Sequence, residues 1–396
     1  MEEKIKEEKE FLVPDYFLDF SCKMGDCRRA CCVGWPVSIS MKEYFSLIGL
    51  DCEKELRVKL DCGLKVASYP SEEKYARFEP RYDGNCPLRA DDGRCLLHAN
   101  LGEEVLPDVC RLYPRGVRLT DGILECSLAN SCEAVLEILF KKETPIEFSL
   151  KKLPLQLPSI APRKTFFETL DMEQKVRLYL ISVIQNRKLS LSERIILLGE
   201  KLDAMDCAFK TKDKDMLNEI LHDNKTELSV QLNPKDVNEK HLKFGLQTME
   251  EIIKILDEGS QSIRECGEAA LKYFGDDKET LNRYFVAKGH FEELIPKWEV
   301  FYENMLVNHM FFSQFPFQDR PESMHSEFVA LCAVYAIMRF LGTGCMAEQR
   351  NKNALIDGMA STFRLIDHTE FDRYASCLLV KLNCSTKEQL YDLVSL

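Results

Sequence analysis

The chain has 396 residues, of which 45% are hydrophobic, and this predicts a globular protein of two to three domains. Its formal net charge of −12 argues against a nucleic-acid surface and favours cationic partners such as lysine side chains. The longest apolar run, residues 328–341, is shorter than the roughly 20 residues of a membrane span, and the first ten residues lack an apolar signal core. We therefore expect a cytoplasmic protein that binds neither nucleic acid nor membrane. Composition leaves its oligomeric state open.

The N-terminal region predicts short elements joined by turns. The β-branched segment 36–39 predicts a strand, and Ser40 followed by Glu43 predicts a capped helix that ends near Gly49. Residues 120–122 predict the turn of a hairpin over 116–128. We also expect a charged helix or frayed tail over 1–12, a strand over 14–20, a helix over 101–110 that Pro107 interrupts, and a helix over 132–140 that is capped by Ser131.

Four prolines between positions 145 and 162 mark the predicted boundary between a cysteine-rich metal-cluster domain, 1–150, and an all-α domain, 151–396. Apolar residues at spacings of three and four predict helices over 166–185, 191–210, 241–256, 262–274, 280–287, 294–312, 325–341, 353–366 and 369–382. The predicted fold class is mainly α: an irregular cysteine-rich part with a small hairpin packs on an all-α helical domain that completes the active cleft.

Seventeen cysteines are distributed unevenly, because eleven of them lie at or before position 132. Thiols stay reduced in the cytoplasm, and an odd number suits a disulfide framework badly. We expect the six later ones to be ordinary core residues: Cys207, Cys266, Cys332, Cys345, Cys377 and Cys384. Nine of the early ones are predicted metal ligands: Cys22, Cys27, Cys31, Cys32, Cys86, Cys95, Cys110, Cys126 and Cys132.

The spacing of these nine thiols suits more than one metal. Iron–sulfur clusters and structural zinc both select thiolates, and loops with short gaps between cysteines bring the sulfurs together without long ordered connections. Spacing alone leaves the two metals equally open. Only His98 could add a histidine ligand, and the excess over four thiols favours an iron–sulfur cluster or more than one metal. Cys31 and Cys32 are adjacent, so we do not expect both to bind one metal in the same way.

Several motifs occur in a fixed order: Cys22-x4-Cys27-x3-Cys31-Cys32-x-Gly-Trp35, Cys86-Pro87-Leu88, Cys110-Arg111-x-Tyr113-Pro114-Arg115, Ser131-Cys132 and Tyr302-Glu303-Asn304-x3-Asn308. This order resembles the flagellin lysine-N-methylase family of bacteria. The resemblance implies an enzyme that moves a methyl group from S-adenosylmethionine to the ε-amine of surface lysines on flagellin, and that requires a [4Fe-4S] cluster. The first half also resembles a wider zinc- or iron-chelating cysteine-cluster family that carries no single activity.

The sequence does not show where the methyl donor binds. It has no Gly-x-Gly-x-x-Gly turn, and position 34 is glycine where the CxxxCxxC signature of radical enzymes needs a cysteine. Polar transfer of the methyl group needs a neutral lysine amine in line with the sulfonium methyl. We expect Tyr113 to be the catalytic residue that helps to keep this amine neutral. The candidate donor-binding residues are Arg111 and Arg115, which could instead pair with acids such as Asp108, and Trp35, which could instead shield a metal.

Two other functions fit the same residues. The first is a non-catalytic protein that binds or delivers zinc or iron, and the second is a radical enzyme that acts on a different substrate. Asn308 and His309 suggest the edge of a pocket, although a lone histidine on an apolar helix usually belongs to the core. An iron–sulfur colour and a stability gain with S-adenosylmethionine would favour the methyltransferase over the metal-binding protein.

Overall fold

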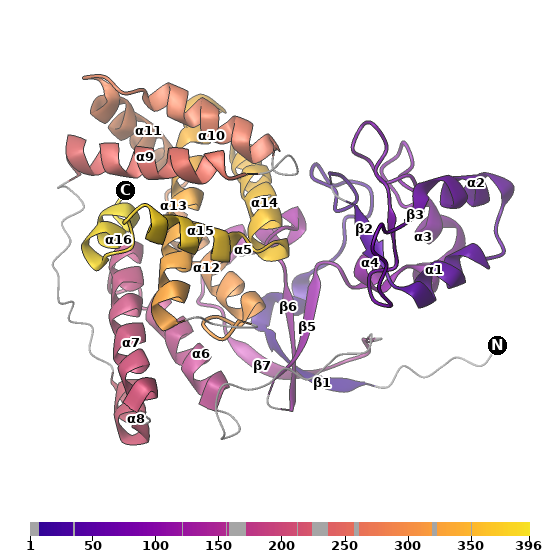
Figure 1. Ribbon diagram of the computed structural model, residues 1–396, viewed down its shortest axis with the longest axis horizontal. Helices are drawn as coiled ribbons and strands as arrows, with labels where there is room; N and C mark the ends of the chain where they lie inside the picture. The colour runs from indigo at the N-terminus through magenta and orange to yellow at the C-terminus, as the bar shows by residue number, and fades with distance from the viewer. Residues whose placement is uncertain are drawn as a thin grey trace.

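The computed structural model describes residues 8–34, 36–120, 122–155, 157, 172–211, 213–223, 237–256, 261–318, 323–349 and 351–396. Figure 1 shows a large helical body, a smaller lobe to one side of it, and a sheet at the base of the body. The lobe is coloured indigo to purple and therefore comes from the N-terminal part of the chain. The predicted fold class, mainly helical with a small N-terminal strand region, is confirmed.

The lobe is a three-stranded antiparallel sheet surrounded by short helices. Its strands, in order across the sheet, are β2 (Val37–Ile39), β4 (Ala76–Phe78) and β3 (Leu64–Val66). Its helices are α1 (Met41–Ile48), α2 (Lys54–Gly63), α3 (Leu96–Leu101) and α4 (Asp108–Leu112), with the 3-10 turn η2 (Glu103–Val105) before α4. The lobe has its own hydrophobic core around Ile39, Leu60, Phe78 and Leu88.

The predicted cap of α1 is confirmed. The Ser40 hydroxyl accepts a hydrogen bond from the Glu43 amide at 3.3 Å, and the Glu43 carboxylate accepts one from the Ser40 amide at 2.7 Å. The second Glu43 oxygen accepts the Asp108 amide at 2.7 Å and so ties α1 to the start of α4. The interruption predicted at Pro107 is confirmed, because Pro107 separates η2 from α4, whereas Leu101 is the last residue of α3.

A four-stranded sheet forms the base of the body. Its order is β5 (Arg115–Thr120), β6 (Ile123–Leu128), β1 (Lys9–Pro14) and β7 (Phe148–Leu153). The predicted hairpin is confirmed as β5 and β6. The strand predicted over 14–20 is instead the 3-10 helix η1 (Asp15–Asp19), and the strand lies before it as β1. The charged run before residue 12 misled the prediction because Phe11, Leu12 and Val13 are buried only by strands that come much later in the chain.

The helical body confirms the periodicity of the sequence. Its helices are α5 (Glu133–Lys141), α6 (Met172–Ile184), α7 (Leu191–Thr211), α8 (Lys214–His222), α9 (Glu239–Lys254), α10 (Gln261–Phe274), α11 (Thr280–Leu294), α12 (Trp298–Ser313), α13 (Met324–Gln349), α14 (Lys352–His368), α15 (Phe371–Lys381) and α16 (Lys387–Val394). Each predicted helix has a counterpart, and α8 and α16 were not predicted. Residues 166–171 of the first predicted helix lie outside the described residues.

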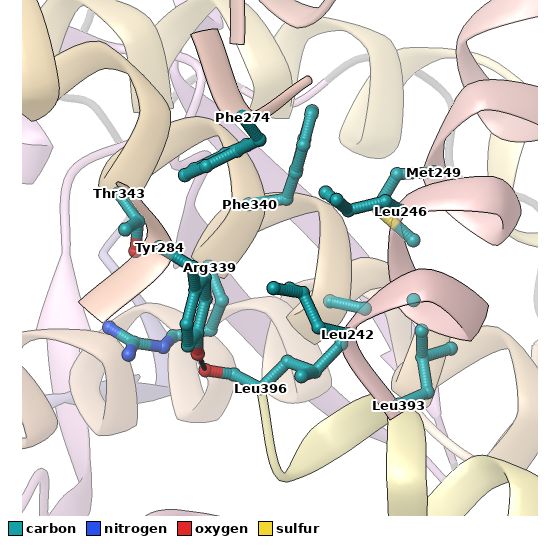
Figure 2. Close-up of a pocket in the computed structure, with 12 residues that line it drawn as sticks. Leu242, Leu246, Met249, Phe274, Tyr284, Arg339, Phe340, Thr343, Leu393 and Leu396 are labelled. Carbon is teal, nitrogen blue, oxygen red and sulfur yellow. Dashed lines mark hydrogen bonds between the residues drawn. The ribbon is translucent and has the colours of Figure 1, made fainter. Parts of the chain in front are cut away.

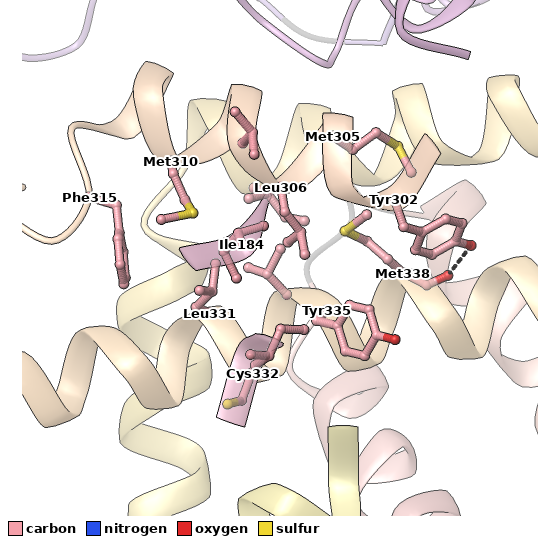
Figure 3. Close-up of a cluster of buried hydrophobic side chains, with 14 of the residues drawn as sticks. Ile184, Tyr302, Met305, Leu306, Met310, Phe315, Leu331, Cys332, Tyr335 and Met338 are labelled. Carbon is pink, nitrogen blue, oxygen red and sulfur yellow. Dashed lines mark hydrogen bonds between the residues drawn. The ribbon is translucent and has the colours of Figure 1, made fainter. Parts of the chain in front are cut away.

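Helix α13 is the centre of the body and contacts α7, α10, α11, α14, α15 and α16. Figure 3 shows its Tyr335 and Met338 packed among side chains of α12, where the Tyr302 hydroxyl donates to the Met338 carbonyl at 3.1 Å. Residues Met324–Cys345 are long and apolar enough to cross a membrane, which corrects the shorter run read from the sequence, but 94% of the apolar window is buried in the protein. An apolar surface on all sides is typical of a helix at the centre of a core.

The core of the body extends into α5 and into strand β6 of the sheet, both of which precede position 150. Leu128 and Val135 belong to the same hydrophobic cluster as the helices. The buried Arg177 guanidinium of α6 binds the Glu125 carboxylate of β6 at 2.7 Å. Asn304 of α12 donates to the carbonyl at the end of α5. The sheet, α5 and the later helices therefore pack as one body.

The six late cysteines do not share one environment. Cys332 is buried in the core as predicted, but Cys207 and Cys377 are exposed. Cys266 of α10 and Cys345 of α13 form a disulfide. The prediction of six ordinary core residues is therefore wrong for the exposed pair and for the bonded pair, because helical spacing did not reveal which cysteine faces a neighbouring helix.

Candidate active site between the lobe and the helical body

The cysteine loop, residues 22–34, is held against the helical body by one arginine. Arg364 of α14 donates to the carbonyl oxygens of Arg29, Ala30 and Val33 at 2.7, 2.8 and 3.0 Å. Hydrogen bonds from a charged donor are stronger than neutral ones, and a guanidinium can reach several acceptors at once. Arg364 therefore sets the position of the loop that carries four predicted ligands.

Charged side chains add a second set of contacts to the cysteine loop. The Lys23 amine lies 2.9 Å from Glu133 and 2.7 Å from Glu137, both on α5. Arg28 lies 3.0 Å from Asp357 of α14. Because Glu133 is almost fully buried, these contacts fix the loop at the point where α5 and α14 meet it.

We expect Arg364→Gln to loosen the cysteine loop. Losing hydrogen bonds worth roughly 1.5–3 kcal/mol each should make the amide hydrogens of residues 29–34 exchange at least about tenfold faster. Hydrogen exchange followed by mass spectrometry measures this directly. Arg373→Gln, at an exposed ion pair with Glu370, is the matched control and should leave the loop unchanged. Equal exchange rates in both variants would refute the role of Arg364.

Four thiols of the lobe and the cysteine loop lie close together. The Cys86 amide donates to the Cys32 carbonyl at 2.8 Å, and Cys95 forms a β-bridge with Arg89. Burial raises the pKa of Cys110, and the neighbouring thiolates of Cys95, Cys86 and Cys32 raise it further. We call Cys32, Cys86, Cys95 and Cys110 the lobe thiol group.

Backbone amides point at the sulfurs of this group. Burial raises the pKa of Cys86 to about 12, while the Leu88 amide donates to its sulfur and opposes the rise. Burial also raises the pKa of Cys95, whose sulfur accepts hydrogen bonds from the amides of His98 and Leu97. Such donors stabilise a thiolate over a thiol, and they recur around metal-bound sulfur.

The adjacent cysteines differ in chemistry. The Cys31 thiol donates to the Cys32 sulfur, and together with Arg89 and Arg364 it lowers the pKa of Cys32 to about 6. The same hydrogen bond, together with burial, raises the pKa of Cys31. Cys32 is therefore the anionic member of the pair. The charges of both Cys110, in the lobe thiol group, and Cys132, at the start of α5, act on Cys31.

A second set of thiols lies at the start of α5. Burial raises the pKa of Cys27 to about 12, and Glu133, Cys132 and Cys22 raise it further. Cys132 is the N-cap residue of α5, and the Val135 amide donates to its sulfur. We call Cys22, Cys27 and Cys132 the helix thiol group. Seven of the nine predicted ligands thus divide into two neighbouring groups.

Cys126 is not part of either group. It is a residue of β6 and is fully buried in the hydrophobic core, where burial raises its pKa to about 12. Across the described ranges, no three histidine, cysteine or acidic side chains are arranged to hold a metal ion. The donor chemistry of the two thiol groups nevertheless suits a thiophilic metal, because most of their sulfurs accept backbone N–H groups.

Arg111 and Arg115, two of the predicted donor-binding residues, have different surroundings. Arg111 is almost buried and pairs with Asp108 of its own helix. Arg115 lies over the ring of Phe20, with 5.2 Å from guanidinium carbon to ring centre, and its Nε is buried without a hydrogen-bond partner among the described residues. Trp35 lies outside the described residues, so its predicted stacking on adenine stays a prediction.

Tyr113 begins a chain of hydrogen bonds that leads into the body. Its hydroxyl lies 3.0 Å from the Ser131 hydroxyl, which lies 2.7 Å from Nε2 of His368 at the end of α14. Burial raises the pKa of Tyr113, and the Cys132 thiolate raises it further. Burial lowers the pKa of His368, so its imidazole is neutral near pH 7 and can accept a proton. We call Tyr113, Ser131 and His368 the hydroxyl relay.

A layer of mostly buried polar side chains, formed by Asn130, Asn308, His309, Asp367 and Asp372, lies next to the hydroxyl relay. Nδ1 of His309 lies 2.9 Å from Asp367, and its Nε2 lies 3.4 Å from Asp372. Asp367 also accepts the Asn130 amide at 3.1 Å, and Asn308 donates to the Asn130 side chain at 2.7 Å. Asn308 and His309 were predicted to form a pocket edge, and the structure places them in this buried layer. Their partners Asn130 and Asp367 directly precede Ser131 and His368 in the chain.

Sequence reasoning missed the residues that α14 contributes. Asp357, Ser361, Arg364 and His368 follow one another at spacings of four, three and four, and therefore share one face of the helix. Asp357 and Arg364 hold the cysteine loop, while His368 holds Ser131. A polar stripe at helical spacing on an otherwise apolar helix was the signal that could have revealed them.

The cavity shown in Figure 2 is not a substrate site. It has a volume of about 30 Å³, which is enough for one water molecule, and its lining is mainly apolar. The Tyr284 hydroxyl donates to the Leu396 carbonyl beside it. Arg339 lies 3.9 Å from the ring centre of Trp298 and contributes to packing there.

Comparison with known proteins identifies the family. Residues 177–389 match the FliB lysine N-methylase C-terminal domain. The chain is 25% identical over 152 residues to proteins named lysine-N-methylase from Salmonella typhimurium (strain LT2) and Salmonella choleraesuis (strain SC-B67), which covers 38% of this chain and 37% of each relative. It is 24% identical over 142 residues to the flagellar biosynthetic protein FliU of Salmonella muenchen, which covers 35% of this chain and 82% of that protein.

No solved structure matches the chain. The match to the two lysine-N-methylases spans well under two thirds of their length, whereas the family domain covers more than half of this chain. The flagellin lysine-N-methylase resemblance of the sequence motifs is thus confirmed at the level of the family. This chain belongs to the FliB lysine N-methylase family.

Proposed function

We propose that the protein is a lysine N-methyltransferase that moves a methyl group from S-adenosylmethionine to the ε-amine of lysines on flagellin or another lysine-rich surface protein. Family membership supports lysine as the acceptor, and the name of the FliU relative supports a flagellar substrate. The observation that carries the proposal is the hydroxyl relay, because it ends on a neutral imidazole that can take a proton. We place the reaction in the cytoplasm.

Methyl transfer requires the lysine amine to lose a proton first. A free lysine has a pKa near 10.4, so most of it is charged at neutral pH. In our proposal the ammonium proton passes to the Tyr113 oxygen while the Tyr113 proton passes to Ser131 and the Ser131 proton passes to Nε2 of His368. The neutral amine then attacks the sulfonium methyl, the carbon–sulfur bond breaks, and S-adenosylhomocysteine leaves. The negative charge of the protein, −12, favours the approach of lysine-rich substrates.

We also propose that the lobe thiol group binds a metal centre, a [4Fe-4S] cluster or alternatively zinc. Cys32, Cys86, Cys95 and Cys110 would supply the ligands, and Cys32 is the most readily ionised of the vicinal pair. A bound centre would cross-link the cysteine loop to the lobe. No step of the proton transfer described above depends on it.

The test is methyl transfer from labelled S-adenosylmethionine to purified flagellin by anaerobically prepared protein, together with iron, sulfide and zinc analysis. We expect Cys32→Ser and Cys110→Ser to lose the metal, because each removes a ligand. Cys377→Ser, at an exposed thiol of α15, is the matched control and should keep the metal. A zinc-loaded wild type that neither binds the donor nor transfers a methyl group would instead identify a metal-binding or delivery protein.

A further inference from the structure

A cleft of about 440 Å³ lies between α10, α13 and α14. Its volume falls in the range of sites that enclose a whole small molecule, roughly 300–1,000 Å³, and is much larger than a single lysine side chain needs. Figure 1 shows α14 on the side of the body that faces the lobe, beside α10. The cleft reaches the cysteine loop, because Arg29 of that loop lines it.

The charged groups of the cleft are of both signs. Arg29 supplies a guanidinium, whereas Glu265 and Asp357 supply carboxylates from α10 and α14. The Asp357 carboxylate also binds Arg28 of the cysteine loop at 3.0 Å. Ser262 and Ser361 add hydroxyl groups to the lining of the cleft. Charges of both signs suit a ligand that carries a carboxylate together with positively charged groups.

Small residues make room for such a ligand. A Cβ added at Gly358 of α14 meets no heavy atom within 4 Å, so this position opens onto free space. At Gly344 of α13 an added Cβ would lie 2.4 Å from Ala270, so α10 and α13 pass close together where both line the cleft. The cleft is therefore open above α14 and closed where α10 meets α13.

We infer that this cleft is the binding site of the methyl donor, with Arg29 on the donor's carboxylate and Asp357 and Glu265 facing its ammonium and sulfonium. The inference rests on the proposed function, which names S-adenosylmethionine as the donor. Ser361 of the cleft and His368 of the hydroxyl relay lie on one face of α14, about two turns apart. The donor site and the proton-accepting relay are thus arranged along one helix, under the cysteine loop.

Gly358→Leu tests the inference by filling the cleft. Leucine favours helices more than glycine does, and its Cβ would meet no heavy atom within 4 Å, so the variant should fold like the wild type. Gly289→Leu, at an exposed glycine of α11 whose added Cβ also meets nothing, is the matched control. By isothermal titration calorimetry we expect S-adenosylmethionine to bind Gly358→Leu at least tenfold more weakly than either the wild type or the control.

Arg29→Gln gives an independent readout that does not depend on the size of the cleft. We expect at least tenfold weaker binding of S-adenosylmethionine but unchanged binding of 5′-methylthioadenosine, which lacks the amino-acid part. Wild-type affinity of Gly358→Leu for S-adenosylmethionine would overturn the location of the site while leaving the proposed function intact. Absence of donor binding in the wild type would overturn the proposed function as well.

Discussion

His309→Gln is expected to lower the free energy of unfolding by about 3–5 kcal/mol, the usual range when one partner of a buried ion pair is removed. The His309 side chain is 3% exposed and lies between Asp367, which is fully buried, and Asp372. Burial alone would lower the pKa of the imidazole, but hydrogen bonds with the two carboxylates raise it to about 10. Glutamine keeps the size of the side chain and removes the charge that balances both carboxylates.

The matched control is His241→Gln, at an exposed histidine 3.8 Å from Asp392. Exposed pairs contribute roughly 0–1 kcal/mol, so this variant should unfold close to the wild type. Chemical denaturation followed by circular dichroism measures both variants. Equal losses of stability at the two positions would show that His309 is not a buried ionic anchor.

The stability contributed by His309 should also depend on pH. The folded pKa lies above the unfolded value of about 6.5, so the contribution is fully present below pH 6.5 and is lost as pH rises through 10. We expect the wild type to lose stability over this interval and His309→Gln to lose less. A wild-type stability that stays level across this range would contradict the assignment.

Removing a member of the hydroxyl relay is expected to slow methyl transfer by about 10²- to 10⁴-fold, the usual contribution of a general base. Ser131→Ala breaks the path between Tyr113 and His368, while His368→Asn removes the final acceptor. Because both variants keep the cleft residues, we expect kcat to fall and donor binding to stay near the wild-type value. Rapid-quench measurement of a single turnover separates the methyl-transfer step from product release.

A pH profile distinguishes proton transfer from a merely structural role. Burial lowers the pKa of His368, so the acidic limb of the wild-type rate should lie below pH 6.5. His368→Asn should lose this limb, whereas His222→Asn, at an exposed helix end, should retain it. If His368→Asn keeps the same acidic limb at a reduced rate, the histidine only positions its neighbours.

Local signals in the sequence predicted much of the fold. The Ser40–Glu43 cap needs residues only three positions apart, and the body helices repeat apolar residues every three to four positions, so both were visible. The strand β1 was not predicted, because it is flanked by β6 and β7, whose residues lie more than a hundred positions away. Neither the charged residues at the start of β1 nor its short apolar run indicates which strands it pairs with.

The candidate site was predicted less completely for the same reason. Spacing indicated the thiols and Tyr113, but the division of the sulfurs into two groups depends on where the lobe meets α5. His368 reaches Ser131 across 237 positions, and Arg364 reaches Arg29 across 335. The spacing of neighbouring residues in the sequence does not predict contacts between partners that are so far apart in the chain.

The position of β1 has a consequence for synthesis. This strand leaves the ribosome long before β6 and β7 are synthesised. The apolar side chains of Phe11, Leu12 and Val13 therefore stay exposed to water or bound to a chaperone until residues 148–153 emerge. The exposed segment is short, and the charges of Lys9 and Glu10 at its start disfavour β-pairing with another nascent chain. Completion of the central sheet is therefore expected to be a late and slow event in the maturation of this protein.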